Sequence, residues 1–547
     1  MTTDDCEERL RLRPGVWSVV DDRGTVHLVQ RWGRGQSLGR LDAGRRALLR
    51  RLAAETATLR ELLDLAARHD VIDTDTDTVT VIDTVIDTVI DTVIDTDIDI
   101  DIDIDIDIDT DTDTDTDTTA SAAASTAHGV LGEAHGVTGA RHGVIALDDV
   151  GGTTRELLDV LLRGGWLETT VGYRGRPLYT LRALCPPPPP PSSMESAGEE
   201  LVLSRFAVIR RDERQMTLES PLAWGRVRVH DPRVMALLGG LAQPTAADAV
   251  GSLPAPAVAR TLRDLRWAGL VIPAGGSEDT ARNLRQWTPH ELWFHERTRM
   301  RDRLPPERGW GRTSWGKGVF DPLPARRTAY SGISVDLPRP DVDALRRLDP
   351  PLAAVVEDRR STRVHDDDNP ITVAQLGELL YRCARIRGSR MEEGEEKLDR
   401  PYPSGGAAHE LELYPVVRLA SGLTPGMYHY DAQEHRLRLV RPAGPEVDRL
   451  LMAAGWAAGT ETRPQVLIIM AARFGRLMLT YQEMPYSLVL KHVGVLQQTM
   501  YLAATAMGLA ACALGGGDAS AFAAATGLED LDEGSVGEFA LGSRPLT

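Results

Sequence analysis

A near-perfect repeat of aspartate with threonine, isoleucine and valine at 71–119 constrains the fold most, because it divides the chain and cannot build a core. Aspartate at almost every second position has the period of a β-strand, but paired strands would stack like charges beside one another. We therefore predict a low-complexity insertion that is disordered or only loosely ordered. Calcium binding is the weaker alternative, since the tract has neither the glycine turns nor the bidentate glutamate of a calcium loop.

The tract also accounts for the acidity of the chain. The formal net charge is −18, from 80 acidic and 62 basic residues. The tract contains 18 aspartates and no lysine, arginine or glutamate, so the remaining acidic residues equal the basic ones in number. The part of the chain that can fold is therefore close to neutral, and its net charge does not identify a partner.

Length, cysteine spacing and apolar runs bound the architecture. A chain of 547 residues is long enough for roughly three or four domains. The four cysteines are too far apart for a metal site or a redox pair, which predicts no metal and a reducing, cytoplasmic setting.

Residues 1–13 lack the apolar core of a signal peptide. Residues 493–517 carry no charge, but they include two glutamines and end in three glycines, so we predict a buried helix and a loop rather than a membrane segment.

Two segments before residue 275 have a similar order of expected elements. In the first, two strands and two helices precede the tract, and a helix, a glycine turn and a hairpin follow it. The second repeats this order, with helices expected at 232–241, 245–250 and 255–267. This order is typical of a winged-helix unit and indicates a duplication. The predicted domains are a winged-helix-like unit at 1–185 interrupted by the insertion, a Pro-rich hinge at 186–199, a second such unit at 200–274, a connecting arm at 275–345 and a final domain at 346–547.

Three arginines and a serine lie within five residues at 359–363. A flavin phosphate is a dianion, and guanidinium groups and hydroxyls are the donors that hold such a group. Arg359, Arg360, Ser361 and Arg363 are therefore candidate phosphate ligands. Taken alone the signal is weak, because most basic clusters are solvated surface.

A second candidate is the turn from Pro403 to Gly406, which precedes a strand expected at 411–417. Glycine lets the backbone approach a flat ligand closely. The backbone N–H groups and the Ser404 hydroxyl could then bond the pyrimidine edge of an isoalloxazine ring. An ordinary turn before a strand is the alternative.

The third candidate is the apolar helix expected at 493–509 with the glycines that follow it. The amides of Gly515 and Gly516 lie on a loop and could face a flavin ring or its phosphate. Taken alone, this segment is equally well explained as a core helix with a glycine cap.

The order of these motifs carries more information than any one of them. Arg-Arg-Ser-x-Arg at 359–363 is followed by a leucine-bearing helix and by Pro-Ser-Gly-Gly-Ala at 403–407, then by Gly-Met-Tyr-His-Tyr-Asp at 426–431 and a central helix near 494–509. This order resembles the nitroreductase fold and, more narrowly, the SagB-type (ThcOx-like) dehydrogenases. The resemblance covers residues 285–545. It implies an α+β chain, in which a nitroreductase-like FMN domain with a central mixed sheet surrounded by helices follows two winged-helix-like units.

The resemblance also implies a homodimer, with two FMN molecules at the subunit interface and both chains lining each site. Phosphate, ribityl and ring contacts are then carried over position by position. The implied FMN-binding residues are Arg359, Arg360, Ser361, Arg363, Pro403, Ser404, Gly405, Gly406, Gln498, Gly515 and Gly516.

SagB-type enzymes oxidise thiazolines or oxazolines, which a cyclodehydratase makes in a ribosomal precursor peptide, to thiazoles or oxazoles. The reaction needs a base for a ring proton while hydride leaves for the flavin, and dioxygen is the expected final acceptor. Many members have a Lys-Tyr pair where this chain has Thr480 and Tyr481. A phenol is a poor base near neutral pH unless a cation stabilises its anion, and Lys491 is the nearest lysine in the sequence. Tyr481 is therefore the candidate catalytic residue, and a packing tyrosine is the alternative.

The implied function is an azoline dehydrogenase that acts on a precursor peptide, in a complex with a cyclodehydratase. The alternatives are an NAD(P)H-dependent flavin reductase of nitro compounds or quinones, and a peptide- or DNA-binding protein with a degenerate flavin domain. The winged-helix-like units could bind a leader peptide by strand addition or serve only as scaffold. Three arginines in the helix at 255–267 leave DNA open, although the fused flavin domain makes nucleic acid the less favoured partner.

Overall fold

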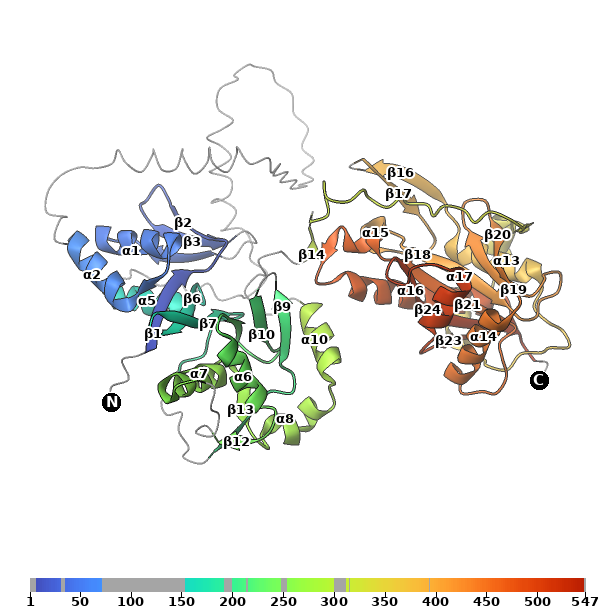
Figure 1. The fold of residues 1–547 in the computed structure, drawn as a ribbon. Coiled ribbons are helices and arrows are strands. Elements are labelled where there is room, and N and C mark those ends of the chain that lie inside the picture. Colours follow the sequence, from blue (N-terminus) through green and yellow to red (C-terminus); the bar gives the residue numbers. More distant parts are fainter. Residues whose placement is uncertain are drawn as a thin grey trace, which may run out of the picture. The chain divides into compact units, whose positions relative to one another are not determined.

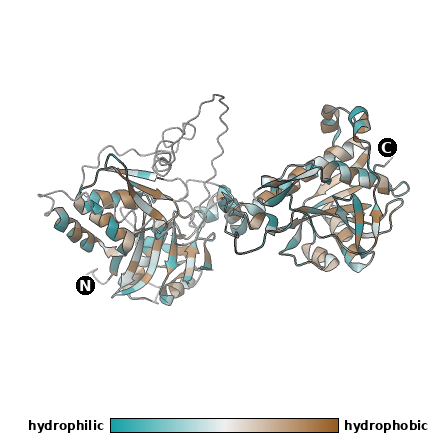
Figure 2. Ribbon diagram, turned by 90° about the horizontal axis from the view of Figure 1, so that it is seen from above, coloured by the Kyte–Doolittle hydropathy of each residue, from teal (hydrophilic) through white to brown (hydrophobic). Residues whose placement is uncertain are grey.

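The computed structural model describes residues 6–30, 35–70, 153–190, 199–212, 215–246, 253–299, 311–313, 315–392 and 394–545. The repeat tract at 71–119 lies outside the described residues. The chain forms two compact units, Met1–Pro289 with Asp302–Leu304 and His290–Arg301 with Pro305–Thr547. Helices of both units carry apolar and polar residues in alternating bands, which is the pattern of helices with one buried side (Figure 2).

The N-terminal unit is built on a seven-stranded antiparallel sheet in the order β5-β1-β6-β7-β11-β10-β9 (Figure 1). Its strands are β1 (Cys6–Leu12), β5 (Ala57–Thr58), β6 (Leu167–Tyr173), β7 (Arg176–Ala183), β9 (Val208–Asp212), β10 (Gln215–Glu219) and β11 (Gly225–Val229). Two three-stranded sheets accompany it, made of β2 (Val16–Val20), β3 (Val26–Gln30) and β4 (Gly35–Gly39), and of β12 (Thr245–Ala246), β8 (Glu200–Leu203) and β13 (Val271–Pro273).

The sheet continues across the Pro-rich segment that was expected to be a hinge. β7 pairs with β11 over five residues, from Gly225 opposite Ala183 to Val229 opposite Tyr179. The Nε1–H of Trp267 also donates to the carbonyl of Pro188 at 3.1 Å. The two predicted N-terminal segments therefore share one sheet, because backbone pairing between distant strands links them.

Helices of this unit follow the predicted order closely. They are α1 (Ala43–Ala54), α2 (Leu59–Asp70), α5 (Thr154–Arg163), α6 (Pro232–Gly240), α7 (Ala255–Ala268), α8 (Ser277–Thr280) and α9 (Arg282–Arg285). Both α5 and α7 end at a glycine and lead into a strand, as the duplication predicts. The helix expected at 245–250 is wrong where the structure describes it, because Thr245 and Ala246 form β12 and pair with β8. The winged-helix character of the two segments remains a prediction.

The C-terminal unit has a seven-stranded sheet in the order β15-β20-β19-β18-β21-β24-β23. Its strands are β15 (Ser334–Asp336), β18 (Leu411–Val417), β19 (Gly426–Asp431), β20 (Arg436–Pro442), β21 (Val466–Arg473), β23 (Leu509–Leu514) and β24 (Glu533–Ser543). Every neighbouring pair is antiparallel, so the prediction of a mixed sheet is wrong. The reason is topological: β24 lies between β21 and β23 and runs opposite to both.

Helices cover both faces of this sheet (Figure 1). One core joins it to α13 (Val373–Ala384) and α16 (Pro485–Ala506), and the other joins it to α14 (Pro445–Ala457) and α17 (Ala519–Thr526). Alternate residues of β21 enter the two cores, Ile468 on the α16 side and Ile469 on the α17 side. A central sheet surrounded by helices is thus confirmed. The shorter helices of the unit are α10 (Pro289–Arg297), α11 (Val342–Leu348), α12 (Leu352–Asp358) and α15 (Gly475–Met478).

The uncharged run at 493–517 forms the end of a helix, a strand and a loop. α16 ends at Ala506, Gly508 takes a positive φ of 70°, and β23 then enters the sheet. The predicted helix is therefore right up to Ala506, and the predicted loop is right only after Leu514. Within the described part of the chain, none of the helices combines the length and the apolar character that crossing a bilayer requires.

Two short strands within the predicted connecting arm pair with strands of the C-terminal unit. β15 pairs with β20, and β14 (Gly311–Arg312) pairs with β22 (Tyr481–Gln482). A hairpin of β16 (Gly388–Glu392) and β17 (Glu395–Asp399) stands beside this region.

Candidate functional site

Two groups of candidate residues meet the central helix α16 at different places. The turn at 404–406 contacts His492, and the arginine segment contacts Tyr501. These two residues are about half a turn apart around the helix and roughly 13 Å apart along it. Both flank the face of α16 that is buried against the sheet.

Tyr501 anchors the arginine segment at 359–363. Its hydroxyl lies 2.8 Å from the Ser361 Oγ and accepts a hydrogen bond of 2.7 Å from the N–H of Ala513 in β23. The Thr362 N–H donates to the carbonyl of Ala511 in the same strand at 2.8 Å. The Arg359 guanidinium lies 5.2 Å from the centre of the Tyr501 ring. The segment is thus fixed on the edge strand β23.

The side chains of this segment remain available to a ligand. Ser361, Arg360 and Arg363 are exposed, and Arg359 is half-buried. Gly515 and Gly516 follow β23, two and three residues beyond Ala513, and are also exposed. A Cβ at either glycine would meet no atom within 4 Å. The arginine segment thus lies along β23, and Gly515 and Gly516 follow that strand. Together their donor groups, cations and open backbone amides form a set that suits an FMN phosphate.

The turn at 404–406 is clamped by a buried histidine. The Gly405 N–H donates to His492 Nε2 at 2.8 Å, and His492 Nδ1 lies 2.7 Å from Glu410 Oε1. Since Nε2 accepts, the proton of a neutral imidazole is on Nδ1 and is donated to Glu410. The Ser404 Oγ accepts the N–H of His409 at 3.0 Å, which closes the turn.

Gly406 lies against the hydroxyl of Tyr481. Its φ is +59°, and a Cβ at this position would stand 2.6 Å from the Tyr481 hydroxyl oxygen. Glycine is therefore required both for the backbone conformation and for the close approach. The turn and the candidate catalytic tyrosine, which the sequence analysis selected separately, are neighbours in space.

Tyr481 lines a cavity of about 180 Å³ with an unusual number of charged side chains. Lys397 of β17 also lines it, whereas Lys491 is exposed on α16 and does not. The lysine nearest to Tyr481 in the sequence is therefore not the one that shares its cavity. The charged residues of the lining are Arg312, Arg390, Glu392, Glu395, Lys397 and Arg476.

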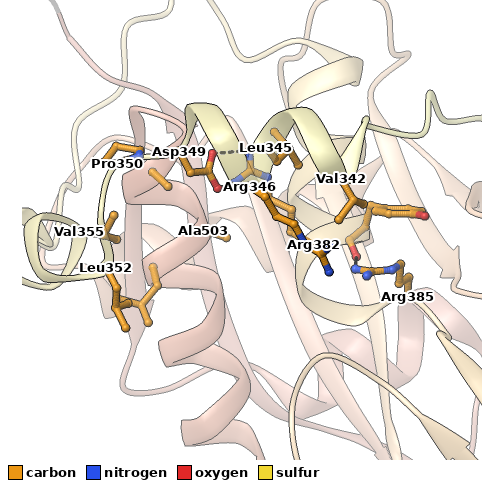
Figure 3. A pocket seen from close by; sticks show the side chains of 13 residues that line it. Val342, Leu345, Arg346, Asp349, Pro350, Leu352, Val355, Arg382, Arg385 and Ala503 are labelled. Carbon is orange, nitrogen blue, oxygen red and sulfur yellow. Dashed lines mark hydrogen bonds and ion pairs between the residues drawn. The ribbon is translucent and has the colours of Figure 1, made fainter.

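A second cavity, of about 380 Å³, lies between α11, α12, α13 and α16 (Figure 3). It is lined by apolar side chains of α11, α12 and α16, including Leu345, Val355 and Ala503. Asp349 and Arg382 form an ion pair of 2.7 Å within its wall. None of its lining residues belongs to the Tyr481 cavity.

Some predicted site residues are not brought together within one chain. Pro403 and Gln498 are exposed, and Gln498 lies on the outer face of α16. The arginine segment and the glycine turn lie at opposite edges of the buried face of that helix. Sequence reasoning missed His492, Glu410 and Tyr501. Each is a single polar residue in or beside an apolar helix or strand, and the sequence does not show which distant group it bonds.

Two protein families match consecutive parts of the chain. The family described as cyanobactin oxidase ThcOx matches residues 201–303, and the nitroreductase family matches 356–543. The C-terminal unit is therefore a nitroreductase-family domain. With the ThcOx match directly in front of it, the chain belongs to the SagB-type (ThcOx-like) branch of the nitroreductase superfamily.

Individual relatives cover only parts of the chain. A nitroreductase-like protein of Methanocaldococcus jannaschii is 27% identical over 184 residues, which is 34% of this chain and 85% of that protein. The trifolitoxin-processing protein TfxB of Rhizobium leguminosarum bv. trifolii is 31% identical over 134 residues, 24% of this chain and 36% of TfxB. The match thus spans about a third of the length of TfxB.

Two solved structures also resemble parts of this chain. A nitroreductase-like protein of Ralstonia eutropha is 24% identical with a TM-score of 0.32, covering 41% of this chain and 96% of that one. A chain of the Escherichia coli microcin synthetase McbBCD complex, solved with truncated pro-MccB17 bound, is 19% identical with a TM-score of 0.30, covering 35% of this chain and 70% of that one.

Proposed function

We propose that this protein is an FMN-dependent dehydrogenase that oxidises thiazoline or oxazoline rings to thiazole or oxazole in a ribosomally made precursor peptide. The observation that carries the proposal is the closeness of Gly406 to the Tyr481 hydroxyl. In the proposed reaction the Gly406 backbone approaches the flavin ring and the Tyr481 hydroxyl takes the proton. The similarity to a cyanobactin oxidase and to a trifolitoxin-processing protein supports a peptide substrate.

The donor set fits FMN. Arg359, Ser361 and the open amides of Gly515 and Gly516 would hold the phosphate and one edge of the ring, and the turn at 404–406 would approach the ring plane. When bound, FMN supplies the hydride acceptor. Dioxygen is the acceptor we propose for reoxidation.

Tyr481 takes the ring proton in this proposal. Its hydroxyl lines a cavity that also contains Lys397, Arg312 and Arg476. Lys397 is thus the lysine that shares the cavity of Tyr481, in a chain that has Thr480 directly before the tyrosine.

We further propose a homodimer, because one chain presents the two halves of the FMN site on opposite edges of α16. A second copy would bring its own glycine turn to the arginine segment of the first. Near its N-terminus α16 exposes Tyr486 by 42% and Leu490 by 40%, and α12 exposes Leu352 by 68%. Large exposed apolar side chains are typical of an oligomer interface.

We propose that the N-terminal unit recruits the precursor peptide. It would do so by binding a leader segment or by docking to a cyclodehydratase that carries the peptide. The helix α7 does not favour DNA, since its arginines are paired with carboxylates. Arg260 bonds Asp264 at 2.8 Å and Glu8 at 2.9 Å, and Arg266 lies 2.5 Å from Glu199. A cytoplasmic location belongs to the same proposal, since the four cysteines are thiols.

The test is turnover of a thiazoline-containing peptide under air, followed by the loss of two mass units. We expect purified protein to be yellow, to release FMN on denaturation, and to need no NAD(P)H. Tyr481→Phe should keep FMN and lose most turnover, with Tyr381→Phe on α13, outside the Tyr481 cavity, as the matched control. A protein that binds no FMN, or one that reduces quinones with NADPH and leaves azolines unchanged, would contradict the proposal. Sedimentation at several concentrations tests the dimer.

A further inference from the structure

The β16–β17 hairpin places like charges opposite one another on the wall of the Tyr481 cavity. In register, Arg390 stands opposite Lys397, and Glu392 stands opposite Glu395. All four side chains line the cavity. Like charges directly opposite on paired strands destabilise a hairpin. A bound group of opposite charge between the two cations would offset that cost.

The two carboxylates of the hairpin are neutralised along their own strands. Arg390 Nη2 lies 2.9 Å from Glu392 Oε2, and Lys397 Nζ lies 2.6 Å from Glu395 Oε2. Arg312 from β14 and Arg476 from α15 add two further cations to the lining. The lining thus contains four basic and two acidic side chains.

Arg476 is held in place by neutral acceptors. Its Nε and Nη2 donate to the carbonyl of Ala408 at 3.1 and 3.0 Å, and its Nη1 donates to the carbonyl of Leu323 at 2.8 Å. The residue is only 9% exposed. Burial, with a contribution from the charge of Arg473, lowers the pKa of Arg476. An anion in the cavity would therefore be favoured by a fixed and poorly solvated guanidinium.

Three cations of the lining lie close to the carboxylate of Glu395. The hydrogen bond from Lys397 is the largest cause that lowers the pKa of Glu395, and the charges of Lys397, Arg476 and Arg312 add to it. These three residues come from β17, α15 and β14, which are distant in the sequence. Their convergence is a property of the tertiary structure.

We propose that this cavity is a subsite for a carboxylate of the substrate, an aspartate or glutamate side chain close to the ring that is oxidised. The inference rests on the proposed function, which places the substrate ring beside the Tyr481 hydroxyl. A cavity of about 180 Å³ with a cationic lining admits a short acidic side chain. The subsite selects precursor peptides with an acidic residue next to the azoline.

The experiment compares azoline peptides that differ only by aspartate or asparagine at each position within two residues of the ring. Binding is read by fluorescence anisotropy of labelled peptide, and turnover by kcat/KM. At one position we expect the aspartate peptide to be favoured by about tenfold, the usual size for a charge-assisted hydrogen bond. Arg312→Gln should remove most of that preference.

Arg387→Gln is the matched control. Arg387 pairs with Asp399 at 2.6 Å at the base of the same hairpin and does not line the cavity. This variant loses one positive charge and should keep the full preference for aspartate. The comparison separates a local subsite from a general effect of net charge.

Each outcome decides between the two proposals. Equal binding and turnover of the aspartate and asparagine peptides would overturn the subsite and leave the dehydrogenase function intact. If no peptide turned over, the anisotropy preference and its loss in Arg312→Gln would still support an acidic ligand. A higher KM for NADPH in Arg312→Gln, with peptide binding unchanged, would assign the cavity to a dinucleotide phosphate and refute the subsite.

Discussion

The backbone N–H of Gly405 donates a hydrogen bond of 2.8 Å to Nε2 of His492. The other ring nitrogen of His492 lies 2.7 Å from Glu410, which is fully buried. The glycine turn is thereby tied to the central helix through one imidazole. The contact makes His492 a positioning residue for the glycine turn.

Removing this imidazole should cost both stability and FMN affinity. His492→Ala leaves a buried carboxylate and a backbone N–H without their partner, at a cost of about 3 kcal/mol in the free energy of unfolding. Glu410→Gln should cost less, because the amide oxygen of glutamine can still accept the Nδ1 proton. Urea denaturation and FMN titration of both variants measure the difference. Equal losses in the two variants would argue against the clamp.

Gly406→Ala should reduce turnover with little change in the overall fold. Alanine would have to keep the positive φ of this position, and its methyl group would stand 2.6 Å from the Tyr481 hydroxyl. The turn or the tyrosine must therefore move. We expect kcat to fall at least tenfold, an effect equivalent to about 1.4 kcal/mol in the barrier. Gly239→Ala on α6, where a Cβ meets no atom within 4 Å, is the neutral control. Unchanged kcat in Gly406→Ala would show that the Tyr481 contact has no part in the reaction.

Tyr501→Phe should weaken FMN binding about fivefold, the effect of about 1 kcal/mol for a lost hydrogen bond. The missing hydroxyl bonds both Ser361 and the N–H of Ala513, so the arginine segment loses one attachment. Quenching of FMN fluorescence measures the affinity. Tyr402→Phe is the matched control for stability, because among the described residues no hydrogen-bond partner reaches the buried Tyr402 hydroxyl. That variant should be neutral or slightly more stable.

Glu538 should make the protein less stable as the pH rises. Burial against Gly517 raises the pKa of Glu538 from its ordinary value of 4.5 to about 7. Between these two pH values, Glu538 is ionised in the unfolded chain but not in the folded one. The contribution of Glu538 to the free energy of unfolding is therefore largest below pH 4.5 and is fully lost above pH 7. The loss amounts to roughly 3 kcal/mol. Glu538→Gln cannot ionise, and the difference in unfolding free energy between variant and wild type, measured from pH 5 to pH 8, should grow in favour of the variant. A constant difference would contradict the raised pKa.

Much of the local structure could be predicted from the sequence, because it depends on residues close together in the chain. Strand β18 has the predicted bounds of 411–417, and strand β19 begins and ends where the Gly-Met-Tyr-His-Tyr-Asp pattern does. The order of the arginine, glycine-turn and central-helix motifs was enough to identify the superfamily. These features follow from hydrophobic period, turn residues and motif order.

Contacts between distant residues were decided only by the tertiary structure. Lys397 shares a cavity with Tyr481, although Lys491 is nearer in the sequence. The strand β24 enters between β21 and β23, which makes the sheet antiparallel instead of mixed. The glycine turn and the arginine segment lie on opposite edges of α16, which a list of motifs does not reveal. Local preferences determine which segments are helix or strand, whereas backbone pairing and burial between remote segments determine which side chains meet.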